Sequence, residues 1–412
     1  MSTATRKSPL TDWTLVVPVV ALVALVFSWG RDLPSGVVAL VALCLGGAVL
    51  AAVHHAEVVA HRVGEPFGSL VLAVAVTVIE VALIVTLMAD GGPKTASLAR
   101  DTVFAAVMIT CNGIVGLSLL VGALRTRVAV FNAEGSGAAL ATVATLAVLS
   151  LVLPTFTTSK PGPEFSTAQL AFAAVASLSL YGVFIAVQTV RHRDYFLPVD
   201  TGAGRSRPAG AASPSEAATA MASASALASA SALASASASA GGGAGREAPA
   251  PVDEDHAEPP SVRDALISLG LLLVALVAVV GDAKAVSPTI ESGVESAGLP
   301  NAVVGVIIAL LVLAPETLAA VRAARRDRVQ TSLNLAYGSA IASIGLTIPA
   351  IALASIWLSG PLLLGLGPIH MVLLALTIVV SALTIVPGRA TLLQAGVHLV
   401  LLAAYLFLAV SP

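Results

Sequence analysis

Long apolar runs separated by short polar stretches are the main pattern along this chain of 412 residues. A helix that crosses the hydrocarbon core of a bilayer, roughly 30 Å thick, needs about 17–25 mainly apolar residues. Eleven runs come close to this length, and we expect each of them to form a transmembrane helix. They cover residues 13–30, 36–54, 66–89, 101–124, 138–157, 167–190, 263–281, 299–321, 330–358, 368–387 and 389–410.

The composition agrees with this pattern, since 57% of the residues are hydrophobic and only 11% are charged. A soluble protein of this length could not bury so much apolar surface, so the sequence predicts an all-α polytopic membrane protein. The net charge of −2 and the absence of a basic cluster give no indication of nucleic-acid binding. Cys44 and Cys111 lie in apolar runs, where packing is their expected role, and we predict no resident cofactor.

The positive charges predict how the helices are oriented. The first run follows a basic segment and could be a signal peptide, but no small-residue cleavage site follows, so we interpret it as a helix. If the N-terminus is inside the cell, five of the 21 Lys and Arg residues lie outside, namely Arg31, Lys94, Arg100, Lys160 and Lys284. Basic residues favour cytoplasmic loops, so we predict an inner-membrane protein with its N-terminus inside and its C-terminus outside.

One long polar stretch, residues 191–262, divides the runs into a group of six and a group of five. Its Ala/Ser/Gly-rich centre cannot form a packed core and is typical of a flexible cytoplasmic linker. Near its end lies an acidic cluster, which is either the solvated end of the linker or a regulatory element that senses cations. The cluster consists of Asp253, Glu254, Asp255 and Glu258.

Two glutamates interrupt the apolar runs, Glu80 in VAVTVIEVALIV and Glu316 in VLAPETLAAV. Each follows a Gly-x-Pro turn, at residues 64–66 and 298–300. The first turn is predicted to be cytoplasmic and the second extracellular, so the two halves would cross the membrane in opposite directions. The sequence therefore predicts an extra N-terminal helix within 1–35 and two inverted five-helix repeats, 36–190 and 263–412, which is a transporter architecture.

A carboxylate within the membrane calls for a structural or functional explanation, because its ionised form costs at least ~2.5–3.5 kcal/mol near the bilayer centre. Glu80 could be a structural acid hydrogen-bonded to Thr77, a proton relay, or half of a cation site shared with Glu316. The shared site is favoured, because hard cations take oxygen ligands and two carboxylates neutralise a divalent ion. Without the cation, two carboxylates in a low dielectric cannot both stay ionised, so they take up protons. Such competition, coupled to alternating access, gives antiport.

Further oxygen atoms are available on the helix that follows each glutamate. Asn112 lies in VMITCNGIVG, and Ser339 and Ser343 lie four residues apart in YGSAIASIG. Residues at this spacing share one face of a helix. For the serines, close helix packing is an equally good explanation, because small residues surround them.

These segments resemble the cation/calcium exchanger superfamily, and most closely its bacterial calcium/proton antiporter branch. The resemblance rests on three motif-bearing segments in family order, residues 64–85, 101–125 and 314–349. It implies a ten-helix inverted core with one added N-terminal helix, in which Glu80 and Glu316 are the paired central acids. Asn112, Ser339 and Ser343 match polar positions on the following helices.

The resemblance also implies acids along the access paths. Glu57 and Glu65 are similar to acids at the cytoplasmic mouth, and Asp282, Glu291 and Glu295 are similar to those at the outer mouth. The acidic cluster of residues 253–258 occupies the place of an acidic regulatory segment in relatives.

The expected function is therefore calcium/proton exchange, with inorganic cations and the lipid bilayer as partners. Val78 and Ile79 replace the Gly-Asn of vacuolar members, and a glutamine of the second polar helix is missing, which leaves sodium or potassium exchange as the alternative. The chain has no HExxH or Gly-x-Gly-Asp motif, so an intramembrane enzyme is disfavoured. A structural protein would not need two mirrored acids. A channel stays an alternative, but a pair of repeat-related glutamates suits occlusion of an ion better than a conducting ring.

Overall fold

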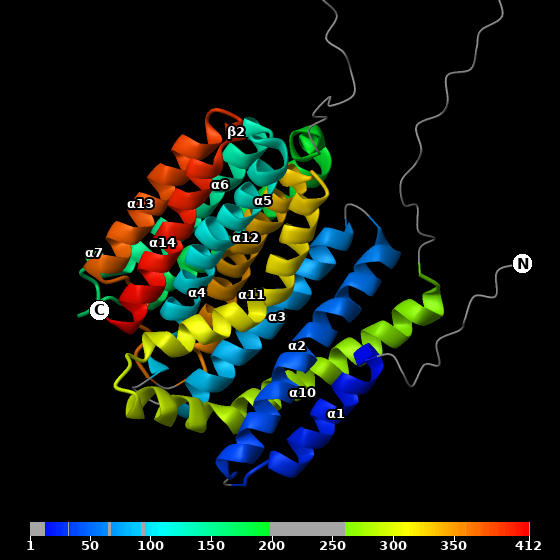
Figure 1. Cartoon of the computed structure of the whole chain (residues 1–412). Helices are drawn as coiled ribbons and strands as arrows, with labels where there is room; N and C mark the ends of the chain where they lie inside the picture. Colours follow the sequence, from blue (N-terminus) through cyan, green and yellow to red (C-terminus); the bar gives the residue numbers. More distant parts are fainter. Residues whose placement is uncertain are drawn as a thin grey trace, which may run out of the picture. The chain divides into compact units, whose positions relative to one another are not determined.

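The computed structural model describes residues 13–31, 33–64, 67–91, 95–197, 260–358 and 360–411, apart from the side chains of residues 35, 67–73, 90 and 91. Most of the predicted linker, including its acidic cluster, and Glu65 therefore lie outside the described residues. The described residues belong to one unit, shown in Figure 1.

The first half of this unit contains α1 (Trp13–Ser28), α2 (Ser35–Val63) and α3 (Phe67–Gly91). Three longer segments follow, in each of which α-helix is joined directly to a π-helical turn. They are α4 (Leu98–Met108), η3 (Ile109–Ile114) and α5 (Val115–Thr126); α6 (Ala133–Ala147), η4 (Val148–Val152) and α7 (Leu153–Phe156); and α8 (Thr167–Ala186) and η5 (Val187–Arg191), followed by the short 3-10 helix η6 (Arg193–Phe196).

The second half contains five helices: α10 (Val262–Ser296), α11 (Ala302–Arg325), α12 (Val329–Ala354), α13 (Pro368–Ile385) and α14 (Leu392–Val410). Each of the eleven predicted runs is therefore helical. Among the described residues, nine helical segments are long and apolar enough to cross a membrane, and α1 and residues 74–89 of α3 are shorter apolar helices. The prediction of an all-α polytopic membrane protein is confirmed.

The predicted end of the seventh helix is wrong, because α10 continues from residue 281 to Ser296. The added residues, DAKAVSPTIESGVES, are too polar for an apolar run but still support a helix. Ser261 caps its start by accepting a hydrogen bond from the backbone N–H of Asp264 at 3.1 Å. The extension carries three of the predicted access-path acids: Asp282, Glu291 and Glu295.

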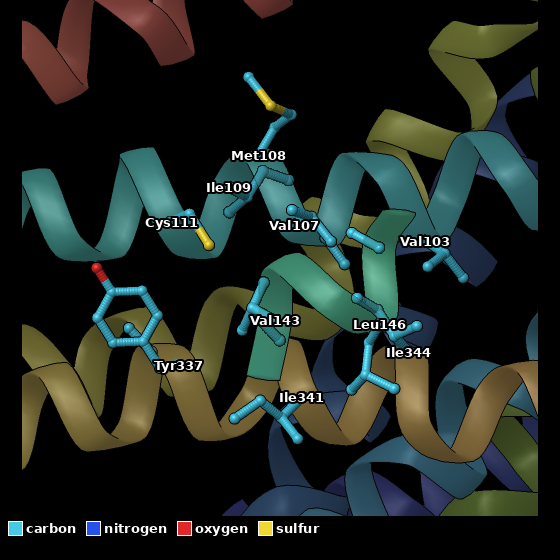
Figure 2. Packing of buried hydrophobic residues seen from close by; sticks show 14 of the residues in the cluster. Val103, Val107, Met108, Ile109, Cys111, Val143, Leu146, Tyr337, Ile341 and Ile344 are labelled. Carbon is cyan, nitrogen blue, oxygen red and sulfur yellow. The ribbon is translucent and has the colours of Figure 1, made fainter. Parts of the chain in front are cut away.

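The large apolar core lies where α4 and η3 pack against α6 and α12. Figure 2 shows aliphatic side chains from these elements meeting in one layer, among them Val103, Val107, Val143, Leu146, Ile341 and Ile344. Glycines allow some of these helices to come very close. A Cβ atom on Gly305 of α11 would lie 3.0 Å from the backbone of Asp101 and Thr102 in α4.

The packing contacts between helices of the two halves come in matching pairs. In the predicted repeats, α12 corresponds to α4 and α11 corresponds to α3. α4 packs against α11, and α12 packs in the same way against α3. Likewise, α5 contacts α14, and α12 contacts α8. α2 and α10, the first helices of the two predicted repeats, pack along each other and against α1, to one side of the core (Figure 1). α12 thus touches helices of the first half along much of its length.

Loops far apart in sequence meet at the ends of the helices. β1 (Ala129–Val130) pairs antiparallel with β2 (Arg389–Ala390), joining two loops that the charge pattern places in the cytoplasm. At the opposite ends, the backbone N–H of Leu363 donates to the carbonyl of Ala96 at 3.0 Å, and Leu366 N–H donates to Leu151 at 2.7 Å. Loops predicted to share a side therefore do contact each other.

The close approach of α11 and α4 predicts that Gly305→Leu destabilises the fold. The added side chain has no room against the α4 backbone, and overpacking typically costs about 1–3 kcal/mol. Gly270→Leu in α10 is the matched control, because nothing lies within 4 Å of its Cβ position. Thermal unfolding of the purified protein should show a lower midpoint for Gly305→Leu only; equal midpoints would contradict the packing.

Candidate functional site

The two membrane glutamates are both hydrogen-bonded to α12. The hydroxyl of Ser343 donates to Oε1 of Glu80 on α3 at 2.7 Å. The hydroxyl of Ser339 donates to Oε2 of Glu316 on α11 at 3.0 Å. Because the serines are four residues apart, they lie on one face of α12, and this face receives an acid from each half of the chain.

The two glutamates differ in exposure. Glu80 is 4% exposed, whereas Glu316 is only half-buried. Because their serine partners are one turn apart on α12, two ionised carboxylates here would repel each other. Thr77 is buried one turn before Glu80 on α3, and its predicted role at the ion site stays a prediction. The arrangement is a pair of carboxylates held by one face of α12, one of them buried and the other partly exposed.

Asn112 makes its hydrogen bonds elsewhere. It lies fully buried in η3, where its Nδ2 donates to Oγ1 of Thr377 on α13 at 3.0 Å. Its Oδ1 lies 3.3 Å from Nδ1 of His398 on α14, and the other ring nitrogen of His398 lies 3.2 Å from Oγ1 of Thr384. The amide predicted as a cation ligand is thus held in a polar cluster with α13 and α14. The sequence carries one signal for this cluster, because His398 is a polar residue within an apolar run, but it was not among the predicted site residues.

The predicted outer acids Glu291 and Glu295 line a pocket of about 40 Å³, together with Asp101 of α4. Thr95, Ser97 and Asn301 add further polar atoms to its wall. Glu291 accepts a hydrogen bond of 2.8 Å from Ser287. Asp101, which our sequence analysis did not select, is therefore a third carboxylate in this region.

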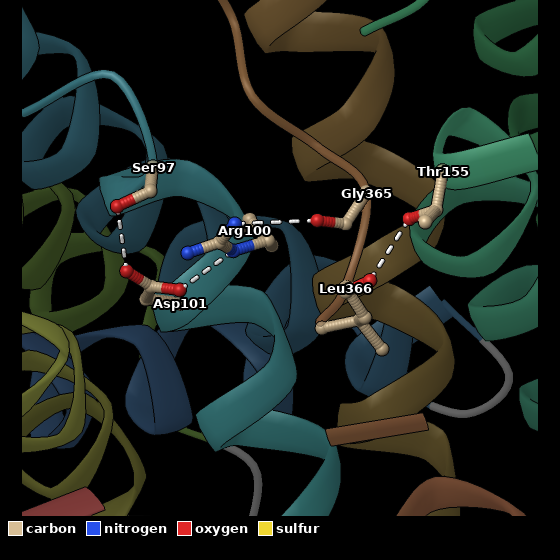
Figure 3. A network of polar contacts seen from close by, with 6 residues as sticks. All are labelled: Ser97, Arg100, Asp101, Thr155, Gly365 and Leu366. Carbon is tan, nitrogen blue, oxygen red and sulfur yellow. Dashed lines mark hydrogen bonds and ion pairs between the residues drawn. The ribbon is translucent and has the colours of Figure 1, made fainter. Parts of the chain in front are cut away.

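Asp101 is neutralised by its neighbour in sequence. Arg100 Nε lies 2.8 Å from Oδ1 of Asp101, and the hydroxyl of Ser97 donates to Oδ2 at 2.8 Å. Arg100 also donates from Nη1 to the carbonyl of Gly365 at 3.2 Å, and Figure 3 shows how this joins α4 to the loop before α13. Thr155 of α7 donates to the carbonyl of Leu366 in the same loop at 2.9 Å. The Arg100–Asp101 pair is thus built into the contact between loops.

The remaining predicted acids lie apart from this pocket. Asp282 is completely buried in α10 and is not among the residues that line the pocket. Glu57 is exposed near the end of α2, where it interacts electrostatically with Arg322 of α11. Glu65 and the acidic cluster of the linker lie outside the described residues, so their predicted roles stay predictions.

The chemistry available to the central pair is the binding of protons or of a cation. Among the described residues, no group of three or more His, Cys, Asp and Glu side chains could hold a metal ion. A cation at Glu80 and Glu316 would therefore complete its shell with the serine hydroxyls, backbone carbonyls or water, which are the ligands that hard cations accept.

The helices of the two halves pack against each other around a pair of carboxylates. These are the features of a membrane cation exchanger. The family model of the sodium/calcium exchanger protein matches residues 33–190 and 267–411. The chain belongs to this family and, within the cation/calcium exchanger superfamily, to the bacterial branch that includes ChaA.

Two relatives match along nearly the whole chain. The putative ionic transporter y4hA of Sinorhizobium fredii is 40% identical over 99% of this chain and 98% of its own. The sodium-potassium/proton antiporter ChaA of Escherichia coli is 33% identical over 96% of this chain and 95% of its own.

Two solved structures share the fold at low identity. Native YfkE has a TM-score of 0.63 at 13% identity, covering 95% of this chain and 97% of that one. The H+/Ca2+ exchanger CAX has a TM-score of 0.63 at 14% identity, covering 96% and 86%.

The loop-joining role of Arg100 predicts that Arg100→Ala lowers stability. Breaking a buried ion pair costs about 3–5 kcal/mol, and the partial exposure of Arg100 should reduce this figure. Lys160→Ala is the control, since Lys160 pairs with Glu164 at 3.3 Å while 48% exposed, and such a pair contributes at most about 1 kcal/mol. Thermal unfolding of both variants checks the difference, and equal losses would show that the Arg100 pair has no special role.

Proposed function

We propose that the protein is a secondary antiporter that exchanges cations for protons across the cytoplasmic membrane. The observation that carries the proposal is the pair of membrane glutamates from opposite halves, each hydrogen-bonded to the same face of α12. Membership of the exchanger family supports the class of transporter, and the pair of glutamates is the site that we assign to the ion.

Competition for the same oxygens would couple the two ions. When a cation binds, both carboxylates are ionised and their charge is neutralised by the ion. When it leaves, mutual repulsion in a low dielectric makes uptake of protons favourable. The hydroxyls of Ser339 and Ser343 donate to the carboxylates here, and their lone pairs could ligate a cation after rotation of the hydroxyl. Each transport step then carries either the cation or protons.

Alternating access would come from two inverted repeats, residues 36–190 and 263–412, with the extra helix within 1–35 outside them. The matching contacts of α4 with α11 and of α12 with α3 support inverted repeats, since repeats related by a two-fold axis make each contact twice. The contacts between loops of the same predicted side support an N-terminus inside and a C-terminus outside. In this arrangement, the pocket with Glu291 and Glu295 would be the outer entrance and Glu57 would lie at the inner one.

Calcium is the cation that the charge of the pair favours. Two ionised carboxylates balance one divalent ion, so an occupied site would carry no net charge in the membrane. Sodium or potassium is the second candidate, because the relative ChaA is named a sodium-potassium/proton antiporter. The hydrogen bonds of the Asn112 amide to α13 and α14 also favour a monovalent cation, since fewer oxygens remain for the larger ligand shell of a divalent ion.

The proposal predicts that both glutamates are required for flux driven by protons. In vesicles with an imposed pH gradient, Glu80→Gln and Glu316→Gln should each abolish cation uptake, because an amide can neither release a proton nor neutralise a cation. Calcium, sodium and potassium uptake should be measured in parallel. Glu134→Gln is a matched control, because Glu134 lies in the first turn of α6 beside its cap Asn132 and outside the site.

Each result of this experiment has a definite meaning. Calcium uptake that depends on the pH gradient and is lost in both variants supports calcium/proton exchange. Uptake of sodium or potassium without calcium supports the second candidate. Flux that ignores the pH gradient, or that survives both substitutions, would refute the proposed mechanism.

The serines should tune the affinity of the site. Removing a hydrogen bond to a charged group costs about 1.5–3 kcal/mol, so Ser343→Ala should change the apparent cation affinity roughly tenfold or more. Ser339→Ala should act less strongly, because Glu316 is more exposed. Ser355→Ala at the end of α12 is the control, since its hydroxyl only donates to the carbonyl of Ala352. Concentration-dependent uptake measures the change, and an unaltered affinity in Ser343→Ala would contradict the assigned contact.

A further inference from the structure

Asp282 is an unusual acid among the described residues of the membrane helices. Its side chain is 0% exposed, and within the described part of the chain neither of its two carboxylate oxygens has a hydrogen-bond partner. All other described carboxylates that are nearly inaccessible have donors: Glu80 has Ser343, and Asp101 has Arg100 and Ser97. An isolated ionised carboxylate in such a place would cost far more than one hydrogen bond can offset.

The surroundings of Asp282 are apolar. One turn before it, Ala278 and Val279 belong to an apolar cluster with α2, α3 and α11. One turn after it, Val286 packs with Val38 and Val41 of α2. Asp282 therefore lies between two apolar clusters in the interface of α10 with α2.

Few ionisable groups face Asp282 from the helices around it. From α2, the nearest ionisable group is the thiol of Cys44, which would be sensitive to a charge on Asp282. α1 has no ionisable side chain, Glu80 of α3 is bound to Ser343, and Glu316 of α11 is bound to Ser339. On α10 itself, Lys284 lies over the ring of Trp29, with its Nζ 6.0 Å from the ring centroid. No described cation is placed to neutralise an ionised Asp282.

We propose that Asp282 is a second proton-binding site, separate from the glutamate pair, which holds its proton while α10 packs against α2 as it does here. The balance is a simple one, in which the carboxylate binds one proton and the acid releases it again. A neutral acid still leaves a hydroxyl group unpaired, at a cost of about 1–3 kcal/mol, but it avoids burial of a charge. Release of the proton then requires that water or a cation reaches the interface between α10 and α2.

Asp282 lies on the same helix as an acid of the outer pocket. Glu291 follows nine residues later on the same helix, and a rise of 1.5 Å per residue places it about 13.5 Å further along the axis. Glu291 lines the pocket that we assign to the outer entrance. Asp282 thus lies deeper in the membrane than the pocket, on the helix that forms one of its walls.

Infrared spectroscopy tests the proposal without any transport, so its outcome is independent of the proposed exchange. A protonated carboxylic acid has a carbonyl stretching band that a carboxylate lacks. The starting variant is Glu80→Gln with Glu316→Gln, which removes the central acids. In lipid vesicles at neutral pH, it should retain a carboxylic-acid band, and adding Asp282→Asn should remove that band. Adding Glu291→Gln instead should leave it unchanged, as expected for an acid at a polar pocket.

The same spectra can overturn the proposal. If the starting variant has no carboxylic-acid band, or if Asp282→Asn leaves the band in place, Asp282 does not hold a proton. If the Asp282→Asn protein does not fold, as judged by gel filtration and circular dichroism, Asp282→Glu replaces it. This variant keeps a carboxyl group in altered surroundings, so the band should shift in frequency, and a band that does not shift rejects the assignment.

Discussion

A carboxylate inside a membrane protein has to find its hydrogen-bond donors within the protein, because the hydrocarbon core offers none. In this structure, one face of α12 supplies them for both central glutamates. Ser339 and Ser343 are four residues apart, so their hydroxyls point to the same side. The acids come from α3 and α11, which belong to different halves of the chain. The position of α12 between these helices is therefore the condition under which two acids can share one site.

The sequence of α12 suits this position because its bulk is low around the serines. Ala340 and Ala342 are buried, and Gly345 would place a Cβ atom 2.8 Å from Tyr181 of α8. Small residues let helices approach closely in membranes, where packing and hydrogen bonds replace the hydrophobic effect between helices. The same small residues made packing an equal explanation of the serines at the level of sequence. Both explanations hold, since close packing is what brings the hydroxyls within reach of the acids.

The sequence predicted much of this arrangement because the membrane restricts the choices. The eleven apolar runs are helical, and Glu80, Glu316 and both serines lie together. Local pattern could not predict the end of α10, where polar residues continue a helix past its apolar part. Nor could it predict the partners of Asn112, because Thr377 and His398 are more than 250 residues away along the chain. Asp101 was missed for a similar reason, as its place in the pocket depends on where the end of α10 and the start of α11 lie relative to the start of α4.

The acids that the structure describes within the membrane helices are stabilised in three different ways, and the differences bear on function. Asp101 has a permanent counter-ion in Arg100, so neither a proton nor a passing cation is needed to keep it buried. Glu80 and Glu316 have only neutral donors, which stabilise a carboxylate but leave its charge to be balanced by a bound ion. Asp282 has no donor among the described residues, so a proton is the simplest way to remove its charge. An acid with a fixed counter-ion is suited to holding structure together, whereas acids without one must exchange their ions whenever their surroundings change. In an exchanger, that exchange of ions at the unbalanced acids is what can link the movement of helices to transport.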